Sequence, residues 1–384
     1  MPDIIVVGGG ITGVATALNL ARAGASVTVL EARDLAAMGS GWTLGGVRQS
    51  GRDPAEIQLA RAAVERWQTL SEDLGADVEY RQRGNLRLAR TSAEVEMIRA
   101  MVTAQAALGL PLQFLSGADA VRAVAPAIAP TVLAASFCPS DGHANPIKTV
   151  QAFADAARRA GAEIREHTPV QRILLDGSKI IGVETRDGAI STSVVVVAAG
   201  MHTPELLSPL GLSLPLNPQI VSVLQTVPAP PRFEQVFGVA NADCAGRQEV
   251  DGRYRVTTGI GDWSNANAAW QANDLQPSCA TVAQMIDRIG MILPAIRDVG
   301  IARVWGGLID LTPDGLPVID APGAIEGLVV AAGFSGHGFG IGPAVGQVVA
   351  DLALGQAPSI NLDAFRFDRF DTLTGSQSAL TLHG

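Results

Sequence analysis

The amino-terminal stretch holds the feature that most constrains the fold: an apolar strand, a glycine-rich turn, a helix and a second apolar strand follow one another. Ile4 to Val7 is a short apolar run of β-branched residues, typical of a buried parallel strand. Gly8, Gly10 and Gly13 form a G-x-G-x-x-G turn, and Glu31 ends the second strand. Such a turn bends tightly, lets a pyrophosphate approach the backbone and lets the helix pack closely on the strand. We therefore expect this unit to bind a dinucleotide at the positive start of its helix.

The acidic residue after the second strand makes this prediction more specific. Glu31 follows the glycines at about the 20-residue distance expected for a carboxylate that binds ribose hydroxyls. The same carboxylate would repel a 2′-phosphate. The alternative is a glycine-rich turn that binds no ligand, and the presence of both strands and the helix argues against it.

The composition narrows the classes of protein that remain. The 384 residues are 47% hydrophobic, enough for a large core and, at this length, for roughly two domains. Only 17% are charged and the net charge is -9, which argues against nucleic acid and anionic membranes as partners. No apolar run is long enough to span a bilayer and no basic segment precedes the first strand, so we expect neither a membrane span nor a signal peptide.

The cysteines and histidines indicate neither disulfides nor metal. Cys138, Cys244 and Cys279 are widely spaced and form no C-x-x-C pair, which predicts a reducing, cytoplasmic location. The five histidines do not pair at ligand spacing, so we expect no metal site.

Strand-to-helix patterns lie at both ends and in the middle of the chain, with β-rich material such as residues 216–258 inserted between them. Residues 39–54 and 333–342 are two further glycine-rich loops, and a helix is expected to begin near Pro343 after the second loop. The expected organisation is a discontinuous nucleotide-binding domain of residues 1–85, 142–215 and 320–384 and a substrate-binding domain of residues 86–141 and 216–319.

Three local patterns give further expectations about secondary structure. Residues 55–74 have the apolar periodicity of one long amphipathic helix. Residues 80–88 suggest a hairpin. Two apolar runs flank Asp176-Gly177, which predicts a hairpin of residues 170–185.

Five stretches carry a resemblance to a known family. They are the amino-terminal unit, the loop from Gly39 to Arg48, the strand end Ala199-Gly200, LTPDGLPVID from Leu311 to Asp320, and GFSGHGFGIGP from Gly333 to Pro343. In this order they resemble the FAD-dependent D-amino acid oxidase superfamily. The most similar branch holds sarcosine oxidase, glycine oxidase and the flavin subunits of heteromeric amine dehydrogenases such as hydroxyproline dehydrogenase or opine oxidase.

The resemblance implies an α/β fold, α+β overall, in which a Rossmann-like FAD-binding domain carries an inserted antiparallel-sheet substrate domain. It also implies a reaction, the oxidation of a C–N bond next to a carboxylate. The hydride passes from carbon to flavin N5, and the resulting imine hydrolyses.

The cofactor residues are assigned partly from the glycine turn and partly from the resemblance. The stretch Gly306 to Asp310 lacks the cysteine to which monomeric sarcosine oxidase attaches its flavin, so we expect non-covalent FAD. The helix near Pro343 is expected to turn its positive end toward the flavin's pyrimidine edge, with Phe334 nearby. The expected cofactor residues are Gly8, Gly10, Ile11, Thr12, Gly13, Glu31, Ala32, Arg33, Ser40, Gly45, Gly46, Val170, Ala199, Gly200, Gly333, Ser335, Gly336, His337, Gly338, Phe339, Gly340 and Ile341.

Four residues are candidates for the chemistry. Arg48 follows the second glycine loop and would hold a substrate carboxylate through two parallel hydrogen bonds, although a solvated surface arginine is the alternative. His337 lies between two glycines of the flavin-facing loop, with simple packing as its alternative role. Tyr254 and Arg255 lie on an expected substrate-domain strand and would line the pocket, and Trp305 would form an apolar wall.

Two departures from the family pattern bear on the reaction. The stretch Gly306 to Asp310 has no arginine, so a carboxylate clamp from that strand is not expected. The two lysines, Lys148 and Lys179, lie outside the β-rich insertion, whereas monomeric sarcosine oxidases use a lysine there to activate oxygen. The sequence therefore favours a dehydrogenase over an oxidase, with Arg255 as a weaker substitute for the lysine.

The resulting hypothesis is an FAD-dependent dehydrogenase of a D-amino acid, an imino acid such as hydroxyproline, an N-methyl amino acid or an opine. A peroxide-producing oxidase and a flavin-holding subunit that is inactive alone remain alternatives. The expected partners are a small amino-acid substrate and either further subunits of a heteromeric enzyme or a separate electron acceptor.

Overall fold

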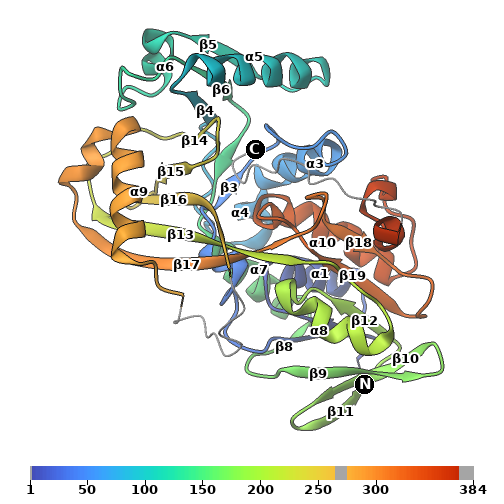
Figure 1. Cartoon of the computed structure of the whole chain (residues 1–384). Coiled ribbons are helices and arrows are strands. Elements are labelled where there is room, and N and C mark those ends of the chain that lie inside the picture. The colour runs from blue at the N-terminus through green and yellow to red at the C-terminus, as the bar shows by residue number, and fades with distance from the viewer. Residues whose placement is uncertain (1, 264–274, 372–384) are drawn as a thin grey trace.

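The computed structural model of the chain describes residues 2–263 and 275–371, and two sheets organise it (Figure 1). The first has six strands in the order β18-β19-β12-β1-β2-β8, parallel except for the β18–β19 pair. The amino-terminal strands lie at its centre, as expected for a nucleotide-binding unit. Its strands are β1 Ile4–Val7, β2 Val27–Leu30, β8 Glu163–Arg165, β12 Val194–Val197, β18 Val318–Asp320 and β19 Leu328–Ala332.

Both faces of this sheet are covered, which explains why its strands are continuous apolar runs. Ile4 and Val6 point into a cluster with helices α1, α3, α7 and α10, whereas Ile5 and Val7 point into a cluster with α8 and a small three-stranded sheet. These elements are α1 Ile11–Arg22, α3 Ile57–Trp67, α7 Pro146–Arg159, α8 Thr203–Leu207, α10 Gly338–Ala353, β9 Val170–Asp176, β10 Lys179–Thr185 and β11 Gly188–Ser191.

Helices from the two ends of the chain cross closely because the crossing residues are small. A Cβ atom on Gly346 of α10 would lie 2.5 Å from the Cβ of Ala15 in α1. One on Gly342 would lie 2.8 Å from the side chain of Ile11. The carboxy-terminal helix is thereby held against the start of the nucleotide-binding helix.

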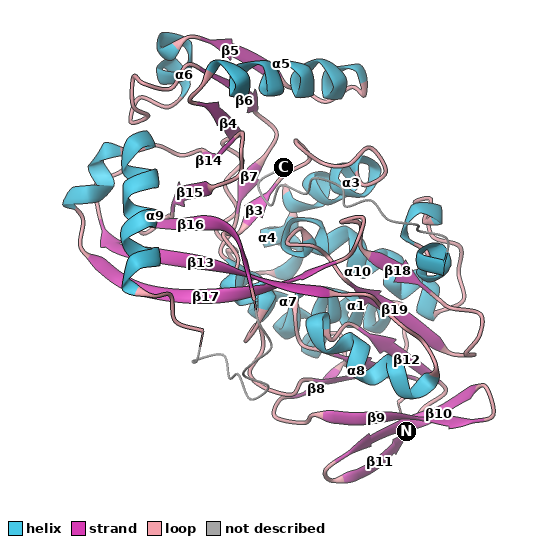
Figure 2. Cartoon of the chain, viewed as in Figure 1, coloured by secondary structure: helices cyan, strands magenta, loops and turns pink. Residues whose placement is uncertain are grey.

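The second sheet has eight strands in the order β17-β13-β16-β15-β14-β4-β6-β5 and is antiparallel except between β14 and β4. Helices α6 and α9 pack on one face. Figure 2 shows β13 and β17 running from beside α9 toward the helices of the first sheet. The elements are β4 Asn85–Ala89, α5 Ser92–Ala107, β5 Gln113–Ser116, α6 Ala118–Val124, β6 Ala134–Cys138, β13 Asn217–Pro228, β14 Val236–Val239, β15 Cys244–Gln248, β16 Arg253–Asp262, α9 Cys279–Ile292 and β17 Ile301–Leu311.

Short elements complete the described chain. They are α2 Gly39–Trp42, β3 Gly46–Val47, α4 Leu70–Leu74 and β7 Gly142–His143, with 3-10 helices at Gly200–His202, Ser208–Leu210, Pro294–Asp298, Asp363–Phe365 and Phe367–Asp371. Within residues 2–263 and 275–371, none of the helices combines the length and the hydropathy needed to cross a membrane. The mixed α/β fold class is confirmed, and the domain boundaries stay a prediction.

Three local expectations have different outcomes. The hairpin of residues 170–185 is confirmed, with β9 paired to β10. The single helix of residues 55–74 is wrong, because it breaks between α3 and α4, where the Thr69 hydroxyl donates to Asp73 over 3.1 Å. The hairpin of residues 80–88 is also wrong, because β4 pairs with the distant strands β6 and β14 instead.

Candidate active site

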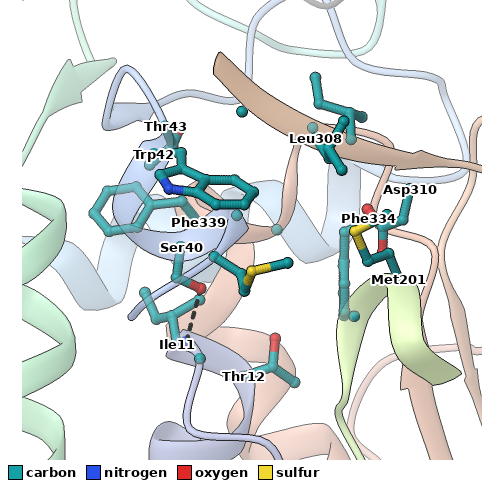
Figure 3. A pocket seen from close by; sticks show the side chains of 18 of the residues that line it. Ile11, Thr12, Ser40, Trp42, Thr43, Met201, Leu308, Asp310, Phe334 and Phe339 are labelled. Carbon is teal, nitrogen blue, oxygen red and sulfur yellow. Dashed lines mark hydrogen bonds between the residues drawn. The ribbon is translucent and has the colours of Figure 1, made fainter. Parts of the chain in front are cut away.

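A cavity of about 510 Å³ lies between the two sheets. One end is formed by the glycine turn after β1 and by the ends of β2 and β12, and the other by residues of the second sheet. Figure 3 shows Trp42, Ser40 and Ile11 along one side of this space and Leu308, Asp310 and Phe334 along the other. The carboxyl ends of parallel strands are the usual place for a nucleotide in such folds.

Two of the three glycines of the turn, Gly8 and Gly13, have the steric roles that the sequence predicts, and Gly10 faces the cavity. A Cβ atom on Gly8, whose φ is +114°, would lie 2.3 Å from the Ala198 carbonyl oxygen. A Cβ on Gly13 would lie 1.9 Å from the Gly8 carbonyl oxygen. Gly10 lines the cavity, and its nearest neighbour is the Ser40 hydroxyl, which accepts a hydrogen bond from the Ile11 amide over 3.0 Å (Figure 3). The helix start therefore faces the cavity without a side chain at the point of closest approach.

Glu31 is fixed at the same end of the cavity. Its Oε2 accepts a hydrogen bond from the Gly9 amide over 2.5 Å, and its Oε1 accepts one from the Arg33 amide over 2.8 Å. Ala32 and Val170 line the cavity beside it. This places a carboxylate where a ribose would lie if a diphosphate occupied the glycine turn.

The carboxy-terminal glycine loop forms the opposite wall. Gly333, Ser335 and Gly336 all have positive φ, and the Gly333 amide donates to Asp310 Oδ2 over 3.0 Å. The helix expected near Pro343 begins earlier, because α10 starts at Gly338 and includes the proline. The interpretation of Pro343 as a first-turn residue is wrong, and the longer helix brings its amino-terminal end directly to the cavity.

The two glycine loops touch each other beside the cavity. A Cβ atom on Gly340 would lie 2.9 Å from the Gly46 carbonyl oxygen. The indole N–H of Trp67 donates to the Gly340 carbonyl over 2.7 Å, and the Trp67 and Phe339 rings lie 5.3 Å apart. This packing fixes the wall that the sequence assigns to the flavin ring.

Buried charged groups gather at the second-sheet end. Arg48 and Arg52 line the cavity, and Arg48 Nη1 donates to the Ser50 carbonyl over 3.1 Å. Arg52 Nη1 lies 3.9 Å from Glu56 Oε2, and His337 Nδ1 lies 3.2 Å from the same oxygen. Burial lowers the pKa of Arg48 well below its usual value, and the positive charge of Arg52 lowers it further.

At neutral pH Glu56 is charged, whereas its neighbour His337 is not. Burial opposes the ionisation of Glu56, but Arg52 and His337 outweigh it and hold the pKa of Glu56 at about 2. Burial, together with Arg52, lowers the pKa of His337 to about 4 despite the neighbouring carboxylate. Glu56 is therefore a carboxylate and His337 a neutral imidazole at pH 7.

The cavity also holds an acid that titrates close to neutral pH, and this gives a first prediction. Burial raises the pKa of Asp310 from 3.8 to about 6. Because the folded-state pKa is the higher one, the contribution to stability is complete below about pH 4 and is lost as the pH rises through about 6. The wild type should lose on the order of 2 kcal/mol of unfolding free energy across this window through Asp310 alone.

Urea unfolding at about pH 4.5 and 7.5 checks this expectation. The Asp310→Asn variant should show a smaller difference between the two pH values than the wild type. The exposed carboxyl in Asp363→Asn is the matched control and should leave the difference unchanged. An equal pH dependence in the wild type and Asp310→Asn would contradict the assignment.

Most of the predicted site residues line this one cavity. Those that do are Gly8, Gly10, Ile11, Thr12, Glu31, Ala32, Arg33, Ser40, Gly46, Arg48, Val170, Ala199, Gly200, Gly336, His337, Gly338, Phe339 and Gly340. Those that are not among the lining residues are Gly13, Gly45, Gly333, Ser335, Ile341, Tyr254 and Arg255.

Tyr254 and Arg255 are not among the residues that line the cavity, although they were expected to line it. The Tyr254 ring is stacked on Phe233, 6.1 Å away, inside the core of the second sheet. Arg255 donates to the Thr43 carbonyl over 2.7 Å, and its guanidinium lies 5.1 Å from the Trp305 ring. Arg255 therefore contacts the backbone of the loop beside the site.

Sequence reasoning missed several lining residues. Arg52 and Asn85 line the cavity, and Glu56 lies directly behind Arg52. Residues 48–56 are not helical, so the four-residue spacing of Arg48, Arg52 and Glu56 does not predict this grouping. The apolar floor comes from distant strands of the second sheet: Val221, Val223, Val236, Phe237 and Ala245.

Comparison with known proteins identifies the family. Residues 3–352 match the family model described as DAO: FAD dependent oxidoreductase, so the chain belongs to that family. Its cofactor is FAD, and the glycine turn that admits a diphosphate, the carboxylate at the ribose position and the cavity beyond them fit this group. The protein is thus an FAD-dependent oxidoreductase.

The chain matches its individual relatives over nearly its whole length but covers different shares of them. The chain is 27% identical to glycine oxidase of Bacillus licheniformis, covering 96% of this chain and 97% of the relative. It is 27% identical to sarcosine oxidase subunit beta of Arthrobacter sp, covering 96% and 91%. It is 26% identical to 4-methylaminobutanoate oxidase (formaldehyde-forming) of Paenarthrobacter nicotinovorans, covering 95% of this chain but 45% of that longer protein. The solved L-proline dehydrogenase from P. horikoshii superposes with a TM-score of 0.87 at 29% identity, covering 96% and 98%.

Proposed function

We propose that this protein oxidises the C–N bond of an amino-acid-type amine and acts as a dehydrogenase. The proposed substrates are D-amino acids, imino acids such as hydroxyproline, N-methyl amino acids and opines. Bound FAD supplies the hydride acceptor, its N5 atom, and the imine product is released to hydrolyse. The relatives named for glycine, sarcosine, proline and 4-methylaminobutanoate all act on such amines and support this substrate class.

A single observation carries the proposal: one cavity joins a dinucleotide turn to a buried pair of guanidinium groups. Arg48 and Arg52 line the end remote from the glycine turn, next to the loop that holds His337. A guanidinium binds a carboxylate through two parallel hydrogen bonds, and burial strengthens that interaction. A carboxylate held there leaves the rest of an amino acid against the apolar floor of the second sheet.

The charges near the cavity support a dehydrogenase. No lysine is among the described residues that line it. Lys148 is paired with Glu79 and Lys179 with Glu326, and both lysine side chains are exposed. A compact ammonium that would stabilise developing superoxide is therefore missing from the lining.

The pattern of cysteines supports non-covalent FAD. Cys138 and Cys244 are buried, Cys279 is exposed, and none of the three is among the described lining residues. We expect denaturation in acid to release the flavin into the supernatant. Flavin that stays with the precipitated chain would contradict this part of the proposal.

A substrate screen with the holoenzyme tests the function. Each amine is mixed anaerobically with the protein, and bleaching of the visible flavin absorbance reports hydride transfer. At least one proposed amine should bleach the flavin, and turnover with an artificial electron acceptor should exceed peroxide release with oxygen by about tenfold or more. No bleaching across the whole panel would remove the proposal, and equal rates with oxygen would make the protein an oxidase.

A flavin-holding subunit is the second candidate function. The observation that favours it is the 27% identity to a protein named as a subunit, sarcosine oxidase subunit beta. In that case the isolated chain binds FAD, but no amine of the panel reduces the bound flavin. Reduction of the flavin in the isolated chain excludes this alternative.

A further inference from the structure

Asn85 is a polar side chain among the apolar residues of the cavity floor. It lies on β4, is 8% exposed, and lines the cavity beside Val236, its partner in the parallel pairing of β4 with β14. Its Nδ2 donates a hydrogen bond to the Ser50 hydroxyl over 3.2 Å. Its Oδ1 accepts no hydrogen bond from the described part of the chain. A ligand that offers a donor to this nearly buried oxygen therefore gains affinity.

A buried carboxylate decides which end of this amide faces the cavity. Asp141 is fully buried, and its Oδ1 accepts from the Gln49 amide over 2.9 Å, while its Oδ2 accepts from the Ser50 amide over 3.3 Å. Burial raises the pKa of Asp141, and its hydrogen bonds and the charge of Arg48 counteract that effect. Because both oxygens already accept backbone amides, the Ser50 hydroxyl is the donor in its contact of 2.5 Å with Oδ2.

The direction of the Ser50 hydroxyl fixes the orientation of the Asn85 amide. A hydroxyl has one proton, and Ser50 donates its proton to Asp141, so its oxygen is an acceptor toward Asn85. The reversed amide would bring two acceptor oxygens together, so Asn85 turns its NH2 group to Ser50. Oδ1 is then the acceptor that Asn85 offers to the cavity. Asp141, which is not among the lining residues, thus sets the polarity of this part of the wall.

We propose that Asn85 is a specificity-determining residue whose Oδ1 accepts a hydrogen bond from a hydroxyl group on the carbon chain of the substrate. This inference rests on the proposed function, because it narrows the amino-acid substrates to those that carry such a hydroxyl. The reacting C–N bond belongs at the loop assigned to the flavin ring, around Phe339. Asn85 belongs instead to the floor that faces the rest of the substrate.

The position of Ser50 also indicates where on the substrate this hydroxyl lies. The Ser50 hydroxyl accepts from Asn85, and the Ser50 carbonyl accepts from Arg48 Nη1 over 3.1 Å. Arg48 and Asn85 both line the cavity, so a carboxylate at Arg48 has Asn85 close by. We therefore expect the hydroxyl on the third or fourth carbon of the acid. A substrate that lacks it leaves the buried oxygen unpaired, which is how a site of this kind discriminates against such analogues.

Carboxylic acids without an amine test this assignment in the holoenzyme without turnover. The dissociation constants of butanoate, 3-hydroxybutanoate and 4-hydroxybutanoate are read from the perturbation of the flavin absorbance and checked by calorimetry. At least one hydroxy acid should bind the wild type about tenfold more tightly than butanoate does. In Asn85→Leu the ratio of the two dissociation constants should fall to about one, because leucine offers no acceptor.

The ratio separates a specificity role from a structural one. If Asn85 only supported the fold, Asn85→Leu would weaken both acids alike and keep their ratio. Asn217→Leu, which changes an exposed asparagine at the start of β13, is the matched control and should keep the wild-type ratio. Equal affinities in the wild type, no binding of any of the three acids, or a preference that survives in Asn85→Leu would overturn the proposal.

A comparison in the wild type alone keeps the test decisive if Asn85→Leu loses FAD. The fluoro analogue of the preferred hydroxy acid has a substituent of similar size that cannot donate a hydrogen bond, so it should bind like butanoate. Binding as tight as that of the hydroxy acid would show that Oδ1 does not face the ligand and would overturn the proposal. These acids have no amine to oxidise, so a failed amine screen removes the proposed function while the role of Asn85 is still judged by its own data.

Discussion

The Gly13→Ala variant is expected to lose its FAD and about 3 kcal/mol or more of its unfolding free energy, although the change adds one methyl group. The added Cβ would lie 1.9 Å from the carbonyl oxygen of Gly8 and 3.0 Å from its carbonyl carbon. Both atoms belong to the backbone, so no side-chain rotation relieves the clash. The helix must move off the turn, and the amides that face the diphosphate move with it.

Gly10→Ala separates the loss of cofactor from the loss of fold. Its Cβ would lie 3.0 Å from the Ser40 hydroxyl and has no closer neighbour, so the protein should fold at near wild-type stability but bind FAD more weakly. Gly323→Ala, which meets nothing within 4 Å, should change neither property. The flavin-to-protein absorbance ratio and urea unfolding measure the two effects. A yellow, stable Gly13→Ala protein would contradict the assignment of this turn.

The amino-terminal unit that contains Gly10 and Gly13 is the part of the fold that the sequence could predict. Strand Ile4–Val7, helix Ile11–Arg22 and strand Val27–Leu30 have the bounds that the apolar pattern and the glycines indicate. Everything that defines this unit lies within about thirty residues, and its conformation follows from local sterics and a buried parallel pairing. Local sequence patterns are informative when the residues that contact one another lie close together in the chain.

Elements whose partners are distant were predicted poorly for the same reason. Residues 80–88 have the alternation of a hairpin, but strand Asn85–Ala89 pairs with Val236–Val239 and Ala134–Cys138. A helix was expected to begin near Pro343, but α10 begins at Gly338, after a loop whose Gly333 amide donates to Asp310. Contacts with distant parts of the chain are involved in both elements. No local sequence signal identifies the partner strand of β4 or the carboxylate that contacts the loop before α10.

The site residues also divide into those that local sequence predicts and those that it does not. Gly8, Gly10 and Glu31 could be predicted to lie together because their positions depend on backbone shape near one turn, and they line the cavity. The group formed by Arg52, Glu56 and His337 joins two segments far apart in the chain, and periodicity does not bring them together. Arg255 was placed on the correct strand, but its side chain turns to the loop at Thr43 rather than to the cavity.

The Arg247→Ala variant is expected to lose about 3–5 kcal/mol of unfolding free energy and to bind FAD more weakly. Arg247 is 2% exposed and lies in the second sheet. Its Nε donates to the Leu44 carbonyl over 2.5 Å, its Nη1 lies 2.8 Å from His143 Nδ1, and its Nη2 lies 3.3 Å from Glu249 Oε1. Burial lowers the pKa of Arg247 only to about 10, so the group is charged at pH 7.

Removing this guanidinium leaves the charge of Glu249 paired with Arg255 at 3.2 Å, the one other cation within 4 Å of it among the described residues. It also frees the Leu44 carbonyl, in a loop that lines the cavity through Leu44 and Gly46. Chemical unfolding and FAD titration of the apoprotein measure the two losses. Arg247→Met/Glu249→Gln removes the cation and the carboxylate together and leaves an amide oxygen as an acceptor for Arg255, so the double variant should be more stable than the sum of the single changes predicts.

Arg253→Ala is the matched control for Arg247→Ala. Arg253 lies on the neighbouring strand and pairs with Asp251 at the surface. Its loss should change stability by less than about 1 kcal/mol, as exposed ion pairs do. If Arg247→Ala and Arg253→Ala behave alike, the buried guanidinium does not tie the second sheet to the Leu44 loop and His143. If Arg247→Ala loses much stability but keeps its FAD affinity, the Leu44 loop keeps its place without the arginine. Arg247 would then stabilise the second sheet alone.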